Sequence, residues 1–282
     1  MGYIVRIKDL AVYAYNGVNP EEQALGQIFL ISAALHTNLD DVVTDDEIEN
    51  TVNYSRVSKF ISQWMAEHSF QLIERVAYHL CREILLRFQG VQSISLEIKK
   101  PNAPIRNMHF DYVSVQKDMA WHEVYLSLGS NAKNASSLLE DAAELIRSNP
   151  DIRGVVCSQS MSTPAYGDKY EGIFLNNALK IETILPPKRL HNLLRGFEAD
   201  LGRDRSREGG IRTIDIDILL YDDLVQSTEN YILPYPDFEH RAYTIIPMCE
   251  IGPNVYHPIL KKTMKKLRKE LPDRQAAKEV KP

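Results

Sequence analysis

The sequence lacks the marks of a secreted or membrane-bound protein. Its three cysteines, Cys81, Cys157 and Cys249, are scattered and form no CxxC motif, which argues against a disulfide framework and a structural zinc site. No apolar stretch is long enough to cross a membrane, and the charged segment 3–9 lacks the apolar run of a signal peptide. We therefore expect a cytoplasmic protein in a reducing compartment.

Positive charge is not in excess either. Lys and Arg number 33 against 38 Asp and Glu, a formal net charge of -5, so no overall basic field attracts nucleic acid. We interpret the locally basic segment 261–282 as a solvated helix end or frayed terminus, the alternative being a nucleic-acid-binding arm. The 282-residue length favours two domains, each with its own core.

Residues 1–120 carry the pattern of one α+β domain. Period-two alternation indicates strands, and apolar residues three or four positions apart indicate helices. In chain order the predicted elements are strands over 3–15 and 27–39, helices over 57–64 and 72–88, and strands over 91–100 and 112–118. The predicted unit is ββααββ, with a turn at 16–20.

A second domain is predicted over residues 121–282. Strands and helices alternate again, which indicates an α+β sandwich. The predicted elements are strands over 124–128, 155–161, 174–184 and 213–221, with helices over 138–146 and 190–201.

Two carboxylates share one face of the strand over 213–221. Side chains alternate along a strand, so Asp215 and Asp217 project to one side while Ile214, Ile216 and Ile218 project to the other. A cation relieves the repulsion between the aspartates, and Mg²⁺ suits a site of few carboxylates completed by phosphate oxygens. For a bare DxD pattern the alternative is a solvent-exposed strand face.

Arginines near this strand favour phosphate chemistry. A guanidinium group neutralises the charge of a transferring phosphoryl group. The chain has no GxxxxGK[ST] loop, so it is not a P-loop kinase. The flanking arginines are Arg203, Arg205, Arg207 and Arg212. Together with the aspartates they predict an enzyme that uses Mg²⁺ and ATP.

From residue 121 onward the chain resembles 6-hydroxymethyl-7,8-dihydropterin pyrophosphokinase. The resemblance implies a ferredoxin-like α+β domain. It also implies transfer of a pyrophosphoryl group from ATP to the hydroxymethyl group of a dihydropterin, leaving AMP. The matching segments are 126–131, Thr163-Pro164, 174–178, Glu198, 201–203 and 212–219.

The resemblance also implies residue roles. Asp215 and Asp217 would hold two Mg²⁺ ions. Phe174 and Tyr243 would sandwich the pterin, where stacking contributes about 0.5–1.5 kcal/mol beyond area burial, and Asn176 would hydrogen-bond its edge. The implied ATP residues are Glu198, Arg203, Arg205, Arg212, Tyr235 and Arg241, with Arg203 and Arg212 also catalytic; the implied pterin residues are Thr163, Phe174, Asn176 and Tyr243.

Two positions depart from that family's pattern. Gly209-Gly210-Ile211 stands where Trp-Gly-Pro is usual, and Pro234-Tyr235 where Pro-His is usual. A glycine-bearing loop can still close over ATP, but without the Trp cover. We expect these departures to affect turnover rather than reaction type. The alternative is a C-terminal half that is a non-catalytic binding or oligomer-stabilising module.

Lys100 is a candidate acid/base residue of the N-terminal half. It shares the parity of Ile94, Leu96 and Ile98 on the strand over 91–100. Burial disfavours the ammonium form, which predicts a pKa lowered toward neutrality and a general acid/base role. The alternative is a snorkelling lysine at a sheet edge. Glu74, taken alone, is explained equally well by a helix dipole.

Residues 1–120 resemble dihydroneopterin aldolase, through segments 15–18, 20–23, 25–27, 46–54, 72–74 and 99–101. That family has the tunnelling fold, a ββααββ unit that assembles into rings with the pocket between subunits. The resemblance implies a homo-oligomer and pterin binding by Ile73 and Glu74, with two hydrogen bonds to Glu74. Asn16 stands where His is frequent, which we interpret as turn chemistry.

The resemblance also implies that Glu22, Tyr54 and Lys100 manage protons. The reaction is retro-aldol cleavage of 7,8-dihydroneopterin to glycolaldehyde and 6-hydroxymethyl-7,8-dihydropterin, without a metal or a Schiff base. The product of this reaction is the substrate of the second. The sequence thus predicts a bifunctional enzyme of folate biosynthesis, acting on pterins and ATP with neither nucleic acid nor membrane as partner. Epimerisation as the main N-terminal reaction stays open.

Overall fold

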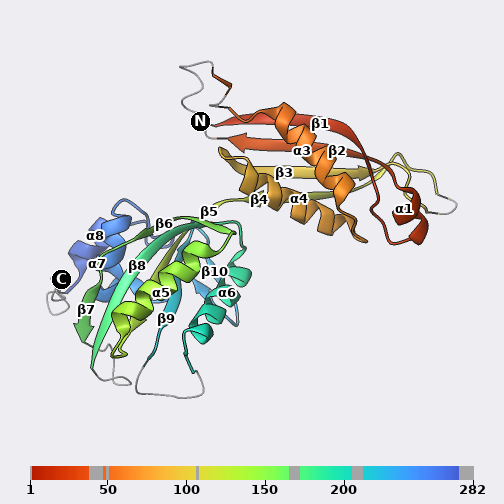
Figure 1. Ribbon diagram of the computed structural model, residues 1–282. Helices are drawn as coiled ribbons and strands as arrows, with labels where there is room; N and C mark the ends of the chain where they lie inside the picture. The colour runs from red at the N-terminus through yellow and green to blue at the C-terminus, as the bar shows by residue number, and fades with distance from the viewer. Residues whose placement is uncertain are drawn as a thin grey trace. The chain divides into compact units, whose positions relative to one another are not determined.

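The computed structural model of the chain describes residues 2–37, 47–48, 51–105, 108–164, 172–204 and 212–272. These belong to two compact units, Met1–Trp121 and His122–Pro282, whose elements are labelled in Figure 1. Within the described ranges, no helix is both long and apolar enough to span a bilayer.

The first unit is built on a four-stranded antiparallel sheet in the order β1-β2-β3-β4. Figure 1 shows two helices, α3 and α4, along one face of it. The elements are β1 Tyr3–Ala14, α1 Pro20–Leu25, β2 Gln27–Thr37, α3 Tyr54–Glu67, α4 Ile73–Arg87, β3 Val91–Lys100 and β4 Val113–Ala120. The ββααββ prediction is confirmed.

The short helix α1 was not predicted. A segment of six residues carries less than two turns of periodicity, so apolar spacing cannot reveal it. Pro20 at its start suits a first helical position, and Glu22 Oε2 accepts a hydrogen bond from Asn19 N at 3.2 Å. The helix therefore orients the Glu22 carboxylate.

Alternation along the central strands places their apolar residues under the helices. Val57 and Ile61 of α3 and Leu80 and Ile84 of α4 are fully buried. The strand side of this core includes Phe29, Ile31, Leu35, Ile94, Leu96 and Ile98. Lys100, at the same parity of β3, is only 9% exposed, so the sequence-based expectation that it is desolvated is confirmed.

The second unit is an antiparallel sheet in the order β6-β8-β5-β9, with β7 pairing with β8. Its elements are β5 His122–Ser130, α5 Ala135–Ser148, β6 Ile152–Cys157, β7 Met161–Pro164, β8 Ile173–Thr183, α6 Pro187–Asp200, β9 Asp215–Tyr221, β10 Gln226–Ser227, β11 Ile232–Leu233, η2 Phe238–His240, α7 Ala242–Ile251 and α8 Met264–Glu270. Two βαβ-type halves with β5 and β8 in the centre give the ferredoxin-like arrangement, as expected.

The single strand predicted over 155–161 is wrong, because the structure has two, β6 and β7. Between them the Ser158 side chain takes part in the pairing with β8, accepting a hydrogen bond from Ala178 N at 2.9 Å. A side chain that replaces a ladder partner breaks the regular pattern, and the alternation of residue types does not show it.

Two apolar layers cover the faces of this sheet. Helices α5 and α6 pack on the face that carries Leu126, Leu128 and Ile216, and α7 and α8 pack on the face that carries Tyr125 and Leu219. We expected a solvated helix end from residue 261. That interpretation is wrong for Met264 and Leu267 of α8, which are buried in the second layer; residues 273–282 lie outside the described part.

Candidate functional site

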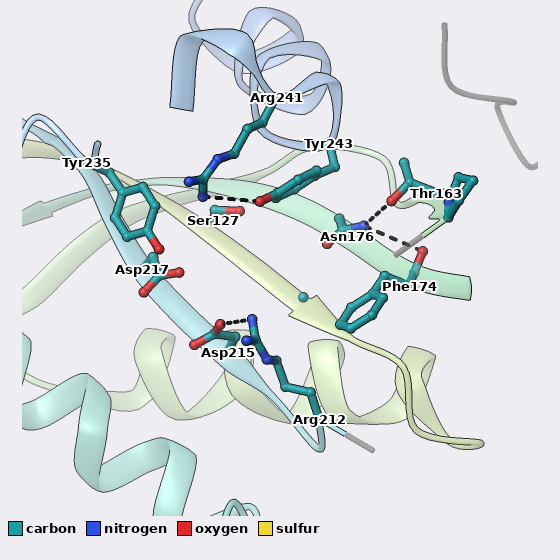
Figure 2. Close-up of a pocket in the computed structure, with 12 residues that line it drawn as sticks. Ser127, Thr163, Phe174, Asn176, Arg212, Asp215, Asp217, Tyr235, Arg241 and Tyr243 are labelled. Carbon is teal, nitrogen blue, oxygen red and sulfur yellow. Dashed lines mark hydrogen bonds and ion pairs between the residues drawn. The ribbon is translucent and has the colours of Figure 1, made fainter. Parts of the chain in front are cut away.

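A cavity of about 240 Å³ opens on the second unit's sheet, on the face that carries Ser127 and Gly129 of β5. Figure 2 shows the side chains around it, which come from β5, β7, β8, β9 and the segment entering α7. It is lined by Ser127, Gly129, Thr163, Pro164, Phe174, Asn176, Arg212, Asp215, Asp217, Tyr235, Arg241 and Tyr243. Most side chains predicted for this half thus line a single cavity.

The two strand carboxylates reach this cavity as the alternation of β9 predicts. Ile214, Ile216 and Ile218 lie in the core on the opposite face. Burial and the neighbouring Asp215 raise the pKa of Asp217 to about 6. Burial also acts to raise the pKa of Asp215, but Arg212 and Arg203 outweigh it and hold that pKa below its ordinary value. The Asp217 carboxylate is therefore the one short of positive charge.

The donor set fits a hard divalent cation. Two carboxylates project from one strand into a polar cavity, and a cation between them would remove the repulsion that raises the pKa of Asp217. Among the described residues there is no group of three or more His, Cys, Asp or Glu arranged to hold a metal. Mg²⁺ accepts such a small protein set because water and phosphate oxygens complete its shell.

Two predicted arginines hold Asp215. Arg212 Nη1 lies 2.5 Å from Asp215 Oδ2, and Arg203 Nη1 is paired with Asp215 Oδ1. Arg203 also donates to Ile214 O at 2.8 Å and pairs with Glu198 at 2.9 Å. Arg203 is therefore fixed in place by backbone as well as by charge.

Glu198 occupies a structural position at the edge of β9. Its side chain is 1% exposed, and it is not among the residues that line the cavity. Its Oε1 accepts a hydrogen bond from Ile216 N at 2.8 Å, on the open side of this edge strand. The carboxylate thus ties α6 to the strand that carries the aspartates, and direct contact with ATP stays a prediction.

Arg195 is a site residue that the sequence analysis missed. It lies on α6 one turn before Glu198, and its Nη2 donates to Asp217 Oδ1 at 3.2 Å. No motif includes it. The spacing of three from Glu198 was the available signal, because residues three apart share a helix face.

The opposite wall of the cavity combines buried polar side chains with two aromatic ones. Asn176 Nδ2 donates to Thr163 Oγ1 at 2.9 Å, and both residues are buried. Gly129 is the strand partner of Asn176. A Cβ at Gly129 would lie 2.7 Å from Asn176 Oδ1, so a larger residue there would force the Asn176 side chain to move. Phe174 and Tyr243 line the same cavity from β8 and α7 (Figure 2).

A second cavity of about 310 Å³ adjoins the first and shares Asp217, Tyr235 and Arg241 with it. The Arg241 guanidinium lies over the Tyr235 ring, 5.3 Å from its centre. The remaining lining includes His191 and Arg195 of α6 and residues 228–233 around β11. Arg205, Arg207 and Gly209-Gly210-Ile211 lie outside the described residues.

In the first unit the structure brings two predicted residues together. Lys100 Nζ forms an ion pair with Glu22 Oε1, and their side chains are 11% and 10% exposed. Burial acts to raise the pKa of Glu22, but hydrogen bonds from Lys100, Asn19 N and Gln27 outweigh it, so this pKa lies below its ordinary value. The sequence argument treated Lys100 as a buried amine without a counter-ion, and Glu22 supplies one.

Tyr54, Ile73 and Glu74 lie at the starts of the two helices. Tyr54 begins α3 and is 67% exposed, and Ile73 and Glu74 begin α4. Within the described residues no hydrogen bond or ion pair joins Tyr54 or Glu74 to the Glu22–Lys100 pair. The structure of one chain therefore brings Glu22 and Lys100 together without these three.

Asn16 connects its turn to a distant segment, a role beyond the predicted turn conformation. It is fully buried, and its Oδ1 accepts a hydrogen bond from Phe70 N at 2.7 Å. The neighbouring Gly17 N donates to Phe70 O at 3.0 Å. The turn before Glu22 is thus tied to the segment that leads into Glu74.

Comparison with known proteins agrees with this two-part description. Residues 5–118 match the family model of dihydroneopterin aldolase, and residues 125–253 match that of 7,8-dihydro-6-hydroxymethylpterin-pyrophosphokinase. The 2-amino-4-hydroxy-6-hydroxymethyldihydropteridine pyrophosphokinase of Methylorubrum extorquens is 40% identical over 46% of this chain and 83% of its own length.

Longer relatives span both parts. Folic acid synthesis protein FOL1 of Dictyostelium discoideum is 26% identical over 95% of this chain and 44% of its own length. Folic acid synthesis protein fol1 of Pneumocystis carinii is 30% identical over 90% of this chain and 36% of its own length, so the chain spans less than half of either protein. The chain joins a segment that matches the dihydroneopterin aldolase family model to a pyrophosphokinase domain, and it belongs to the 7,8-dihydro-6-hydroxymethylpterin-pyrophosphokinase family.

Proposed function

We propose that this chain catalyses two consecutive steps of folate biosynthesis. The first cleaves 7,8-dihydroneopterin to glycolaldehyde and 6-hydroxymethyl-7,8-dihydropterin, and the second transfers a pyrophosphoryl group from ATP to the new hydroxymethyl group. The observation that carries the proposal is the cavity in which Asp215, Asp217 and Arg212 face Phe174 and Asn176. Phosphate chemistry and flat-ring recognition meet there.

In the second step the pterin occupies the first cavity and ATP the second. The hydroxymethyl oxygen attacks the β-phosphorus, the bond between that phosphorus and the oxygen bridging to the α-phosphate breaks, and AMP leaves. Asp217 lies where the two cavities meet, which suits a group that must face both substrates. Arg203 and Arg212 neutralise negative charge that develops on the phosphates.

Asp215 and Asp217 would hold Mg²⁺, two ions by analogy with the family. When bound, Mg²⁺ supplies positive charge to the triphosphate oxygens. The chain's own contribution is to hold the carboxylates at a fixed spacing on β9, which Glu198 anchors through Ile216 N. Tyr235 and Arg241 stack at the junction of the cavities and would position the nucleotide, together with Arg205.

In the first step Glu22 and Lys100 form the proton-handling pair. An amine and a carboxylate in contact and nearly buried can pass a proton to and from the substrate without bulk water. Tyr54 would join them, with Ile73 and Glu74 binding the pterin. Tyr54 is 67% exposed and Leu72 56%, as expected for residues that complete a pocket against a second copy of the chain. We therefore propose a homo-oligomer formed through the N-terminal domain.

We assign residues 1–120 to the aldolase reaction and residues 121–282 to the pyrophosphokinase reaction, in the cytoplasm.

The test is a coupled assay with purified protein, 7,8-dihydroneopterin, ATP and Mg²⁺. The expected products are glycolaldehyde, AMP and the pyrophosphorylated pterin. AMP no higher than in an ATP-only control would overturn the second activity and favour a non-catalytic C-terminal module. Accumulation of the epimer of the substrate in place of glycolaldehyde would overturn the first.

A further inference from the structure

One guanidinium group on α6 reaches all three acidic side chains of the C-terminal site. Arg195 Nη1 lies 2.6 Å from Glu198 Oε1 and 3.6 Å from Asp215 Oδ1, and its Nη2 lies 3.2 Å from Asp217 Oδ1. Within the part of the chain that the structure describes, no other cationic side chain contacts the Asp217 carboxylate. Arg195 is therefore the counter-ion of the carboxylate that is shortest of positive charge.

This contact and a divalent cation compete for the same oxygen. A cation that binds between the aspartates needs lone pairs of Asp217, and Arg195 already donates to Oδ1. The positive guanidinium also repels an arriving cation. Metal that binds through Oδ1 has to share that oxygen with Arg195 or displace it, and in either case the guanidinium stays close to a divalent charge.

The Arg195 side chain can turn toward the second cavity, whereas the Arg203 side chain is held in place by its contacts. The Arg195 side chain is 27% exposed and lines the second cavity beside Tyr235 and Arg241. Arg203 is 13% exposed and is tied to Ile214 O. A triphosphate in the second cavity gives Arg195 new acceptors of the kind that guanidinium groups prefer, and Asp217 is then released.

We propose that Arg195 makes divalent-cation binding at Asp215 and Asp217 depend on a nucleotide triphosphate in the second cavity. Without nucleotide, Arg195 holds Asp217 as a substitute cation. With nucleotide, it turns to the phosphates and frees the carboxylate for the metal. The proposal rests on the proposed pyrophosphokinase function and adds an order of assembly to it. Arg195 acts as a positioning residue, through Asp217.

Thermodynamic linkage sets the expected size of the effect. If Arg195 couples the two ligands, its removal strengthens metal binding without nucleotide, and the tightening of metal binding by nucleotide shrinks by a similar factor. Coupling between two sites is typically about 5- to 150-fold. We expect at least about a fivefold change in each quantity.

The test measures Mn²⁺ binding by electron paramagnetic resonance on the full chain, with and without a non-hydrolysable ATP analogue. Arg195→Gln removes the charge while keeping a polar side chain. The control is Lys188→Gln, which removes an exposed positive charge from the same helix, at a residue with no contact to the aspartates. Retained aldolase activity and an unchanged unfolding temperature identify a folded variant. Arg195→Lys serves as a second variant, because lysine keeps the charge but cannot bridge two carboxylates with one planar fork.

The expected result is tighter Mn²⁺ binding by Arg195→Gln without nucleotide and a smaller gain on adding the analogue, with Arg195→Lys between it and wild type. Unchanged or weaker Mn²⁺ binding by folded Arg195→Gln without nucleotide, in the presence of normal nucleotide-dependent binding by wild type, would overturn the role of Arg195 alone. Absence of Mn²⁺ binding by wild type even with the analogue would instead remove the metal site, and the proposed pyrophosphokinase function with it.

Discussion

The two candidate sites of this chain differ in how complete they are within one chain. The C-terminal site has its carboxylates, arginines and ring-binding residues around one cavity in one unit. Of the described residues predicted for the N-terminal site, Glu22 and Lys100 form an ion pair, and Tyr54 is exposed at a helix start. The proposed pyrophosphokinase site is therefore complete within a single copy of the chain, whereas the proposed aldolase site would draw on a second copy.

Their charges differ as well. At the C-terminal site Arg195, Arg203 and Arg212 neutralise three carboxylates, an arrangement that an anionic triphosphate can rearrange. The N-terminal site has one buried pair of opposite charges, suited to moving a proton. If the two sites are independent, a change in one leaves the other reaction intact.

The largest expected effect is loss of the second reaction in Asp217→Ala. Removing one carboxylate from a site that balances a triphosphate and a metal should lower AMP formation by at least about 10²- to 10³-fold. Glycolaldehyde release should stay at the wild-type rate. Both are measured on the same preparation, and parallel loss of the two reactions would contradict independent sites.

A smaller effect is expected for Glu22→Gln, which keeps the size of the side chain and removes its proton-accepting charge. Glycolaldehyde formation should fall by about 10²-fold, the lower end of the usual contribution of a general acid or base. AMP formation from added 6-hydroxymethyl-7,8-dihydropterin should not change. The matched control is Glu21→Gln, one residue earlier in α1 and exposed, and an equal loss there would count against a specific role for Glu22.

A milder effect is expected for a substitution at Gly129, beside Asn176 in the wall of the first cavity. Gly129→Ala places a Cβ 2.7 Å from Asn176 Oδ1, so the Asn176 side chain must move at a cost of about 1–3 kcal/mol. We expect a higher KM for the pterin in the second reaction, with KM for ATP little changed. Steady-state kinetics that show an equal rise in both KM values would mean that Gly129 supports the whole site rather than this wall.

The smallest predicted effect is a pH dependence of stability confined to the second unit. Burial lowers the pKa of His257 from 6.5, although Glu239 acts to raise it. The unfolded chain therefore takes up the proton first, so stability falls as pH drops below about 6.5 and is restored above it.

His257→Asn tests this origin. Asparagine can accept the hydrogen bonds that Ile259 N and Leu260 N donate to His257 Nδ1, but it does not titrate. Urea midpoints at pH 5.5 and 7.5 should differ less in this variant than in wild type. His240→Asn, at a histidine that is 71% exposed, is the control. If its pH dependence changed as much as that of His257→Asn, another group would be responsible.

Local patterns were enough to predict the strand that carries Asp215 and Asp217. The alternation of Asp215, Ile216 and Asp217 depends only on strand geometry, and burial on the opposite face follows from it. Lys100 was placed on the buried face of β3 for the same reason. Periodicity predicts the face of a strand on which a side chain lies, and Asp215, Asp217 and Lys100 lie on the predicted faces.

Features that depend on contacts between distant segments were not predicted. Arg195 becomes a site residue only because α6 packs beside the edge of β9; its spacing of three from Glu198 indicates a shared helix face but not that neighbour. Asn16 was interpreted from its turn, whereas its hydrogen bond reaches Phe70, far along the chain. The helix α7 has apolar residues on all sides and contains Pro247, so neither periodicity nor propensity identified it.

The most direct test of two independent, consecutive sites is to mix two separately purified variants, each with one site removed. Asp217→Ala alone should turn 7,8-dihydroneopterin into 6-hydroxymethyl-7,8-dihydropterin without AMP, and Glu22→Gln alone should leave it nearly unconverted. The mixture, given ATP and Mg²⁺, should form AMP and the pyrophosphorylated pterin. A mixture that forms no AMP, although each variant keeps its remaining activity, would contradict the model of two separate sites linked by a released intermediate.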